Sequence, residues 1–204
     1  PGEATSRMLT SSPALVAVGD SFRVLGFGFS GAAAKVFLRS LSWSAPPYVD
    51  ITGWIVAGTH TETRIELRVA SPVSGRAILP GSYQVYVQNG VAISNFSPVA
   101  IAPAIASQAA APPGIDPVSG TVGTGFTLNG GPFSGAGIQT TEVYFGSISL
   151  RQVTAAPGPG EFRVVTATQI QAAVPNNLST GYYPLRVVVN GISTPPIRWF
   201  QVTP

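Results

Sequence analysis

The sequence states one pattern twice, about 104 residues apart, and this duplication constrains the fold more than any other feature. Residues 18–22 (VGDSF) return as residues 122–126 (VGTGF), and the Phe-Ser-Gly of residues 29–31 returns at 133–135. Further segments match in the same order: 34–38 with 141–145, 63–67 with 168–172, 81–85 with 181–185, and 89–91 with 190–192. A period of this length is a whole domain rather than a solenoid unit of about 20–50 residues. The chain is therefore predicted to hold two copies of one domain.

Each copy has the pattern of short β-strands separated by turns. Period-two alternation and β-branched residues predict strands at 15–18, 21–25, 34–38, 63–69, 82–88 and 99–102, and then at 124–128, 142–145, 161–166, 169–174, 182–189 and 197–202. Asn89-Gly90 and Asn190-Gly191 each fall between two apolar strands, where a type I′ hairpin turn needs positive φ at both central residues. Six or seven short strands with such turns predict an immunoglobulin-like β-sandwich in each copy.

Composition agrees with an all-β chain and helps to place the domain boundary. Charged residues make up only 9% of the chain, whereas 23 glycines and 19 prolines supply many turn positions. Residues 104–111 are apolar and Ala-rich, but they lack the polar face of a surface helix and run into Pro112-Pro113. We therefore predict two tandem immunoglobulin-like β-sandwiches, residues 1–103 and 115–204, joined by a semi-rigid Ala/Pro-rich linker at 104–114.

The start of the second copy resembles a known variant of this fold. In the immunoglobulin-like domains shared by plexins and transcription factors, a Pro, a Ser-Gly pair, a Gly-rich bend and then a Gly and a Phe recur. These places are filled here by Pro117, Ser119, Gly120, Gly123, Gly125, Gly130 and Phe133. The resemblance implies the fold and says almost nothing about activity.

A narrower resemblance covers nearly the whole chain. The segments that carry it are 16–31, 35–39, Trp54, 79–83, 181–187, 190–192 and 195–199. They are similar to the C-terminal region of the tail-cap (terminator) proteins of phage-tail-like contractile injection systems. In that family an N-terminal domain caps the inner tube and sheath as a hexameric ring, and some members carry immunoglobulin-like extensions.

This resemblance implies a set of expectations about assembly and location. The chain would be the extension alone, without the capping domain, and its partners would be proteins at the end of the sheath and tube. The isolated fragment would be a monomer, while the full-length cap protein would be hexameric. The protein would be found in the bacterial cytoplasm during assembly and then in a particle that is released or membrane-attached.

Aromatic residues supply the candidate binding sites. The segment 41–54 departs most from the repeat and places Trp43 and Tyr48 beside a Pro-Pro turn, where aromatic loop residues commonly anchor a protein or a sugar. Trp54, in contrast, is expected in the sandwich core, as a strand-C tryptophan often is. Trp199 is a third candidate stacking platform. Because shared positions specify the fold, function is expected where the copies differ, above all at 41–54.

Residues for catalysis, metals or cofactors are scarce. The chain has no cysteine and one histidine, His60, which lies in a polar stretch and is expected to be a solvated loop residue. Carboxylates are not duplicated with the fold, since Asp20 corresponds to Thr124 and Glu66 to Gln171. The Gly-rich run 120–131 lacks the Lys and the following helix of a phosphate loop. We therefore expect no catalytic, cofactor or metal site, and no enzyme activity.

Charge and hydropathy limit the remaining classes. The net charge is only +3, and the eleven Lys and Arg residues are scattered, so nucleic acid is not an expected partner; DNA binding would show itself by steep salt dependence. No stretch approaches the roughly 20 apolar residues that span a bilayer.

The main prediction is a non-enzymatic structural and protein-interaction module, the C-terminal part of an injection-system cap. The alternative is a carbohydrate- or cell-surface-binding immunoglobulin-like module.

Overall fold

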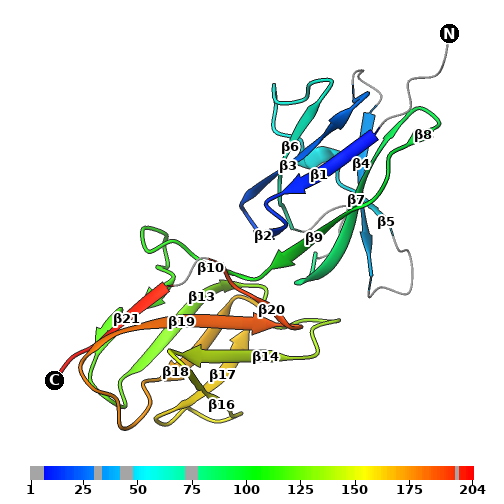
Figure 1. Cartoon of the computed structure of the whole chain (residues 1–204). Coiled ribbons are helices and arrows are strands. Elements are labelled where there is room, and N and C mark those ends of the chain that lie inside the picture. The colour runs from blue at the N-terminus through cyan, green and yellow to red at the C-terminus, as the bar shows by residue number, and fades with distance from the viewer. Residues whose placement is uncertain (1–6, 30–33, 42–47, 72–77, 196–197) are drawn as a thin grey trace. The chain divides into compact units, whose positions relative to one another are not determined.

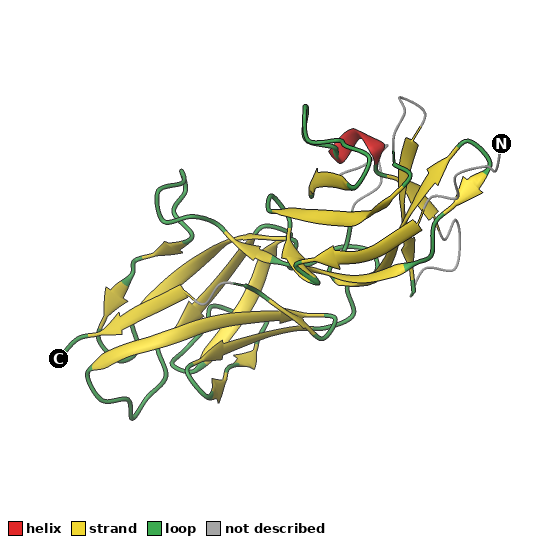
Figure 2. Ribbon diagram, turned by 45° about the horizontal axis from the view of Figure 1, so that its top comes forward, coloured by secondary structure: helices red, strands yellow, loops and turns green. Residues whose placement is uncertain are grey.

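The computed structural model of the protein describes residues 7–29, 34–41, 48–71, 78–195 and 198–204. Residue contacts divide the chain into two units, 1–101 and 102–204. Figures 1 and 2 show that strands form almost all of the regular structure in both units. In the described part of the chain the one helical element is a 3-10 turn at Thr52–Trp54. No helix among the described residues is long and apolar enough to cross a membrane.

The first unit is built from two sheets. The smaller sheet has the order β1-β3-β6, formed by Arg7–Ser12, Ser21–Phe27 and Arg64–Arg68. The larger sheet has the order β2-β9-β7-β4-β5, formed by Leu15–Ala17, Ser97–Ala102, Gly81–Asn89, Ala34–Ser40 and Tyr48–Asp50. The short strand β8, Ala92–Ile93, pairs with β7.

The second unit repeats this plan. One sheet has the order β10-β13-β18-β17-β16, formed by Ala104–Ile105, Gly125–Gly131, Gln169–Ala173, Glu161–Thr166 and Arg151–Gln152, with β11 (Ile115–Asp116) also on β13. The other has the order β12-β21-β19-β14-β15, formed by Ser119–Gly120, Arg198–Val202, Gly181–Val189, Thr141–Phe145 and Ile148–Ser149, with β20 (Ile192–Ser193) on β19. The predicted all-β architecture of two immunoglobulin-like sandwiches is confirmed.

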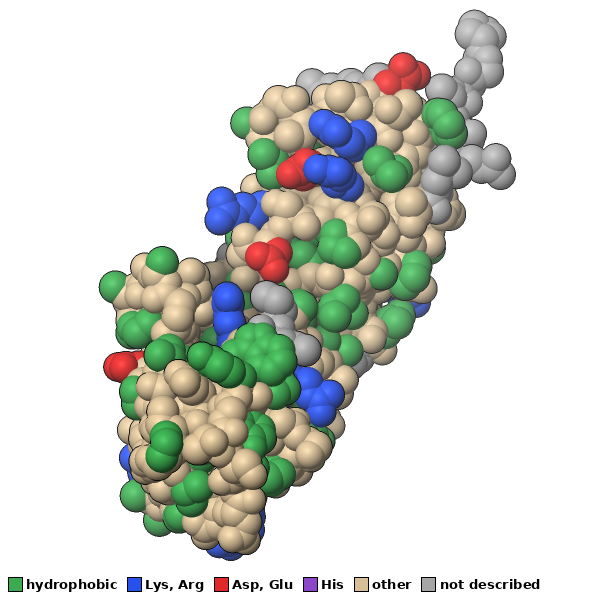
Figure 3. Space-filling view, turned by 60° about the vertical axis from the view of Figure 1, so that its left-hand side comes forward, with side chains coloured by type: hydrophobic (Ala, Val, Ile, Leu, Met, Phe, Trp, Pro, Cys, Tyr) green, Lys and Arg blue, Asp and Glu red, His purple; other side chains and the backbone are tan. Residues whose placement is uncertain are grey.

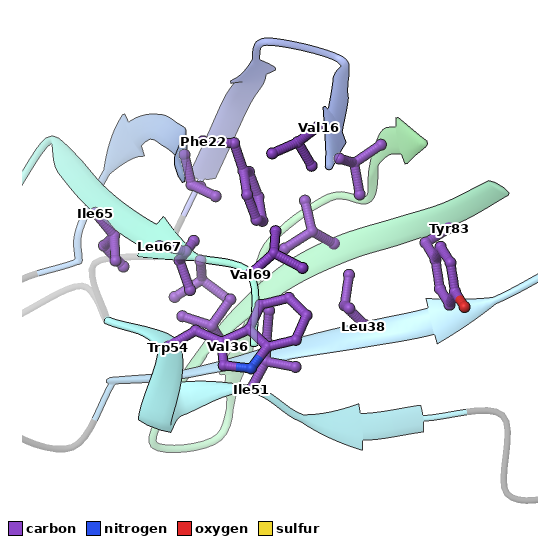
Figure 4. Close-up of a cluster of buried hydrophobic side chains, with 14 of the residues drawn as sticks. Val16, Phe22, Val36, Leu38, Ile51, Trp54, Ile65, Leu67, Val69 and Tyr83 are labelled. Carbon is purple, nitrogen blue, oxygen red and sulfur yellow. The ribbon is translucent and has the colours of Figure 1, made fainter. Parts of the chain in front are cut away.

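Alternation along the strands separates the core from the outer faces. In β4, Val36 and Leu38 are buried while Lys35 is exposed, because successive side chains of a strand point to opposite faces. Figure 4 shows the resulting core of the first unit, in which the indole of Trp54 lies among Val36, Ile51 and Leu67. The expectation that Trp54 is a core residue is confirmed. A separate core in the second unit includes Phe126, Phe145 and Phe200.

The duplicated positions are mostly interior. Phe22 and Phe126, and likewise Phe29 and Phe133, are buried in their own units. The Val18 and Val122 pair differs from this expectation: Val18 packs partly against the first core, whereas Val122 is exposed. Both valines lie in a turn rather than inside a strand, and this explains why the repeat does not bury them fully.

The two Asn-Gly hairpins have different turns. Val189 pairs with Ile192, so Asn190 and Gly191 are the central residues, and their φ angles of 50° and 78° fit the predicted type I′ turn. In the first unit Asn89 itself pairs with Ala92, so the central residues are Gly90 and Val91. Gly90 has φ of 59° and Val91 is not among the positive-φ residues, the pattern of a type II′ turn. The type I′ prediction for Asn89-Gly90 is therefore wrong, because the register is shifted by one residue.

Residues 104–114, expected to be a linker, are bonded into the second unit. Ala104 and Ile105 form β10 opposite Gly131 and Gly130, and Ile105 is buried in the second core. A Cβ atom built on Gly130 would lie 2.0 Å from the carbonyl oxygen of Ala104, so this approach requires glycine. The side-chain amide of Gln108 then bonds both the N–H and the carbonyl of Ile115, at 2.9 and 2.6 Å.

Candidate functional site

The structure places two of the three aromatic candidates on open surface. Trp43 lies outside the described residues. Tyr48 opens β5 in the first unit and is 42% exposed, and Trp199 lies on β21 in the second unit and is 56% exposed. Tyr48 lies on the outer face of the β2-β9-β7-β4-β5 sheet of the first unit. Trp199 lies on the outer face of the corresponding β12-β21-β19-β14-β15 sheet of the second unit.

The outer face of the first unit carries an aromatic cluster that we call the first face: Phe37, Arg39, Tyr48, Tyr86 and Phe96. Alternation puts Phe37 and Arg39 on the outward side of β4 and Tyr86 on the outward side of β7. Phe37 is directly opposite Tyr86, and Arg39 is directly opposite Tyr48. Four strand or loop segments thus bring these side chains together through cross-strand pairing.

Tyr86 is the centre of the first face. Its ring stacks on Phe37 with centroids 5.1 Å apart and an interplanar angle of 13°. Tyr48 and Phe96 approach it edge-on, with centroid distances of 5.8 and 5.1 Å. Burial under these rings, together with the nearby Tyr48 and Asp50, raises the pKa of the Tyr86 hydroxyl above 10.0, its ordinary value. The covered Tyr86 therefore supports the more exposed Tyr48 and Phe96.

Polar groups border the first face. The Arg39 guanidinium carbon is 5.9 Å from the Tyr48 ring centroid and 5.7 Å from that of Phe96, which is cation–π distance to both. On β7, Gln84 is opposite Arg39 and Gln88 is opposite Lys35. The face consequently offers apolar ring surface with amide and guanidinium donors at its edge.

The outer face of the second unit carries a second set, which we call the second face: Tyr144, Tyr182, Arg186 and Trp199. Tyr182 and Arg186 project from β19, where Tyr182 is 67% exposed, and Trp199 projects from β21 opposite Pro184. The Arg186 guanidinium carbon lies 4.2 Å from the Tyr144 ring centroid. The Tyr144 hydroxyl donates to Glu142 at 2.7 Å, and this bond is the main cause of the raised pKa of Tyr144.

The two faces occupy the same place in the repeat. Phe37 follows Val36 as Tyr144 follows Val143, and Tyr86 stands three residues after Tyr83 as Arg186 does after Tyr183. Phe37 is opposite Tyr86, and Tyr144 is opposite Arg186. An aromatic ring therefore recurs at one outward position, with an aromatic partner in one copy and a cationic partner in the other.

Sequence reasoning missed most of this arrangement. Phe37 stands between Lys35 and Arg39 on the polar side of an alternating strand, and Tyr86 stands between Gln84 and Gln88 in the same way. An aromatic ring at an outward position of a strand is a usable signal. The sequence-based hypothesis instead concerned the segment 41–54, of which residues 42–47 lie outside the described residues. Whether that segment carries function stays a prediction.

Groups suited to catalysis or metal binding are not gathered in the described part of the chain. Among those residues no group of three or more His, Asp or Glu side chains could hold a metal ion. His60 is half-buried rather than solvated, because its Nε2 lies 2.6 Å from the carbonyl oxygen of Phe29. Glu66 is bonded across the sheet to Arg23 at 3.3 Å.

On one side of the molecule the surface is weakly charged. Figure 3 shows one side of the molecule, on which Lys, Arg, Asp and Glu side chains are few and hydrophobic side chains lie among neutral polar ones. Such a surface suits neutral ligands better than highly charged ones.

Comparisons with known proteins return structures and no sequence family. No family model matches the chain, and no curated protein matches it. Among solved structures, it is similar to SGBP-B from a complex xyloglucan utilization locus in Bacteroides uniformis, with 20% identity, a TM-score of 0.31 and coverage of 93% of this chain and 47% of that one.

Two further structures are similar. SGBP-B from a Bacteroides ovatus mixed-linkage glucan utilization locus has 16% identity, a TM-score of 0.33 and coverage of 95% and 45%. The surface glycan-binding protein of Prevotella bryantii has 12% identity, a TM-score of 0.35 and coverage of 97% and 41%. The chain spans less than half the length of each of these three proteins.

These findings correct the family expected from the sequence. The three similar structures described above are surface glycan-binding proteins, and neither a family model nor a curated relative supports a link to contractile injection systems. The identification as a tail-cap extension is therefore wrong. The resemblance has a physical cause other than common family. The immunoglobulin-like fold itself requires turn glycines, hairpin residues and core aromatic residues, so unrelated domains of this fold share them.

Proposed function

We propose that this chain is a non-enzymatic carbohydrate-binding module that holds glycans on the first and second faces. The observation that carries the proposal is the recurrence of an outward aromatic ring at equivalent positions of both units, where Phe37 is opposite Tyr86 and Tyr144 is opposite Arg186. A pyranose ring presents an apolar face of C–H groups and a rim of hydroxyls. Exposed aromatic rings pack against the former, and guanidinium and amide groups bond the latter.

The second face is the stronger candidate for direct stacking. Trp199 and Tyr182 are more than half exposed, so a ligand can reach their ring faces without rearrangement of the unit. Trp199 lies opposite Pro184, and Pro184 is two residues from Tyr182 on the same face of β19. Trp199 and Tyr182 are therefore diagonal neighbours, a separation that suits two neighbouring sugar rings of one glycan chain. Arg186 beside Tyr144 adds donors for hydroxyl groups.

On the first face the aromatic rings are less exposed and more firmly supported. Tyr48 and Phe96 are about 40% exposed and are held in place by Tyr86 beneath them. Their fixed orientation reduces the entropy lost on binding, because few side-chain rotamers need to be ordered. Tyr48 and Trp199, both candidates from the sequence, thus take part in the proposal, each on its own unit.

The proposal assigns no catalytic role to the acidic side chains. Glycoside hydrolysis needs two carboxyl groups about 5–10 Å apart around the scissile bond. In the described structure, Glu142 is bonded to Tyr144, and Glu66 and Glu161 are each paired with an arginine. Glu142 would therefore meet a ligand on the second face as the acceptor of the Tyr144 hydroxyl bond.

Affinity gel electrophoresis with soluble polysaccharides tests the proposal. Xyloglucan and mixed-linkage glucan are practical probes, because they are named for two of the similar structures. Retardation of the wild-type chain, lost in Trp199→Ala and weakened in Tyr48→Ala, is expected. Val165→Ala, which also removes an exposed hydrophobic side chain but lies on β17 away from both faces, is the control. Absence of binding to a broad glycan array, or equal binding by all variants, would contradict the proposal.

A further inference from the structure

The smaller sheet of the first unit has a concavity on its outer side that neither face includes. Its volume is about 450 Å³, within the range of about 300–1,000 Å³ typical of ligand pockets. Ser12 and Pro13 at the end of β1, alternate residues of β3, and Arg64 and Glu66 of β6 line it. The β3 residues are Ser21, Arg23 and Leu25, which alternation directs to one side of the strand.

Of the two arginines that line this concavity, one is bonded to the glutamate and the other is not. The Nε of Arg23 donates to Glu66 at 3.3 Å, and these two residues are opposite each other on β3 and β6. Arg64 is exposed, and its side chain makes no hydrogen bond or ion pair with any residue that the structure describes. Two arginines and one glutamate give the lining a net charge of +1 at neutral pH. One guanidinium is left to bind an anion.

Besides the guanidinium, the lining offers groups suited to a polyhydroxylated ring. Ser12 and Ser21 present hydroxyl groups, and the carboxylate of Glu66 is a further acceptor beside them. Leu25 and Pro13 contribute apolar surface on which C–H groups can pack. An inorganic phosphate, which carries about −1.5 to −2 charges, would exceed the net charge of the lining and leave this apolar surface unused.

We infer that this concavity binds the carboxylate of an acidic sugar, a uronic acid residue of a polysaccharide, with Arg64 as its anchoring residue. The inference rests on the proposed function, since it adds a third, charge-selective site to a carbohydrate-binding chain. The planar guanidinium bonds a carboxylate through two parallel N–H···O bonds, a geometry that a neutral hydroxyl cannot match. Arg23 stays engaged with Glu66, and the serine hydroxyls bond the ring hydroxyls.

Isothermal titration with tetragalacturonate tests this site, and the fully methyl-esterified tetramer is the matched neutral probe. The acidic tetramer is expected to bind at least tenfold more tightly than its ester, with affinity that falls as salt is added. Arg64→Gln is expected to weaken binding of the acidic tetramer by about tenfold or more, since a hydrogen-bonded charge pair is lost. Unchanged thermal melting of the variant shows that the unit is still folded.

Arg68→Gln is the control, because Arg68 lies four residues further along the same strand, outside the lining, and the charge change is identical. Its affinity should stay within about twofold of wild type. Equal binding of the acidic tetramer by wild type and Arg64→Gln, or no binding at all, would overturn the inference even where neutral glycans bind the aromatic faces. Arg64-dependent binding without any neutral glycan binding would support it and reject the assignment of the two faces.

Discussion

The hydroxyl group of Tyr83 donates a hydrogen bond to the carbonyl oxygen of Leu79, four residues earlier, over 2.6 Å. Tyr183 bonds the carbonyl oxygen of Ser179 in the same way over 2.9 Å. A tyrosine that bonds back to the chain just upstream of its strand is the tyrosine corner of immunoglobulin-like sandwiches. Its presence in both units shows that the repeat preserves a specific bond as well as a hydrophobic pattern.

Removal of either hydroxyl should lower stability, and by different amounts. Tyr83 is 2% exposed, so Tyr83→Phe leaves a carbonyl without its partner at a dry site and is expected to cost about 1–2 kcal/mol of unfolding free energy. Tyr183→Phe, at a more open site, should cost about 0.5 kcal/mol. Urea denaturation measures both, with the exposed Tyr182→Phe as control. A stability of Tyr83→Phe equal to wild type would show that the corner bond contributes nothing.

Ser94 and Thr194 extend the short β-ladders at equivalent places. The Ser94 N–H donates to the carbonyl of Val87 at 2.8 Å, and its hydroxyl oxygen accepts from the Val87 N–H at 2.9 Å. Thr194 bonds Val187 in the same two ways. Ser94→Ala should therefore destabilise the first unit by about 1–3 kcal/mol, since it leaves a buried N–H unpaired.

Amide hydrogen exchange locates this effect. Faster exchange of the Val87 amide in Ser94→Ala, beyond what the loss of global stability explains, is the expected signature. Ser82→Ala, an exposed serine on the same strand as Val87, is the control and should change neither quantity. Unaltered exchange at Val87 would mean that a water molecule or a shifted backbone replaces the hydroxyl.

Alternation made the central strands predictable, whereas elements held by distant partners were missed. β4 and β19 follow from their period-two pattern, and both appear at nearly the predicted residues. β1 has no such pattern. Its buried Ser11 is instead bonded to Ser97 and Pro98, which are more than 80 residues away in the chain.

The same distinction holds for the candidate site. Trp199 is a candidate from the sequence, and the outward positions of Phe37 and Tyr86 follow from the alternation of their strands in the same way, so they too were predictable. The position of Phe96 could not be found in this way, because it lies outside the strands and meets Tyr86 only through the folded hairpin. Nor could the concavity beside Arg64, which depends on the register of β3 with β6.

The pH dependence of the second unit should reflect Glu161. The backbone N–H of Gly158 donates to its carboxylate at 2.9 Å, and this bond, with that from Arg151, lowers the pKa of Glu161 below its ordinary value near 4.5. The folded state therefore favours the ionised carboxylate. This contribution to stability is complete above about pH 4.5 and is lost as the pH falls through the lowered pKa.

Glu161→Gln should remove that dependence. Thermal melting from pH 7 to pH 3 is expected to show the largest difference between wild type and variant above pH 4.5, with the curves converging at the acid end. Glu142→Gln, an exposed carboxylate on the other sheet of the same unit, serves as the comparison. A constant difference across the whole range would show that the carboxylate charge is not responsible.

The start of the second folding unit can be tested by truncation. The fragment 102–204 keeps β10 and the Gln108 amide bonds to Ile115, whereas a fragment that begins at Ile115, the boundary predicted from sequence, loses both. Because Ile105 is buried in the second core, the shorter fragment should be less stable by about 2–3 kcal/mol.

Ile105→Ala in the longer fragment should cost about 2 kcal/mol or more by itself. Urea denaturation of the three proteins decides between the alternatives: equal stability of the two fragments would mean that residues 104–114 are a linker after all, and that the contacts of β10 with Gly130 and Gly131 add nothing to folding.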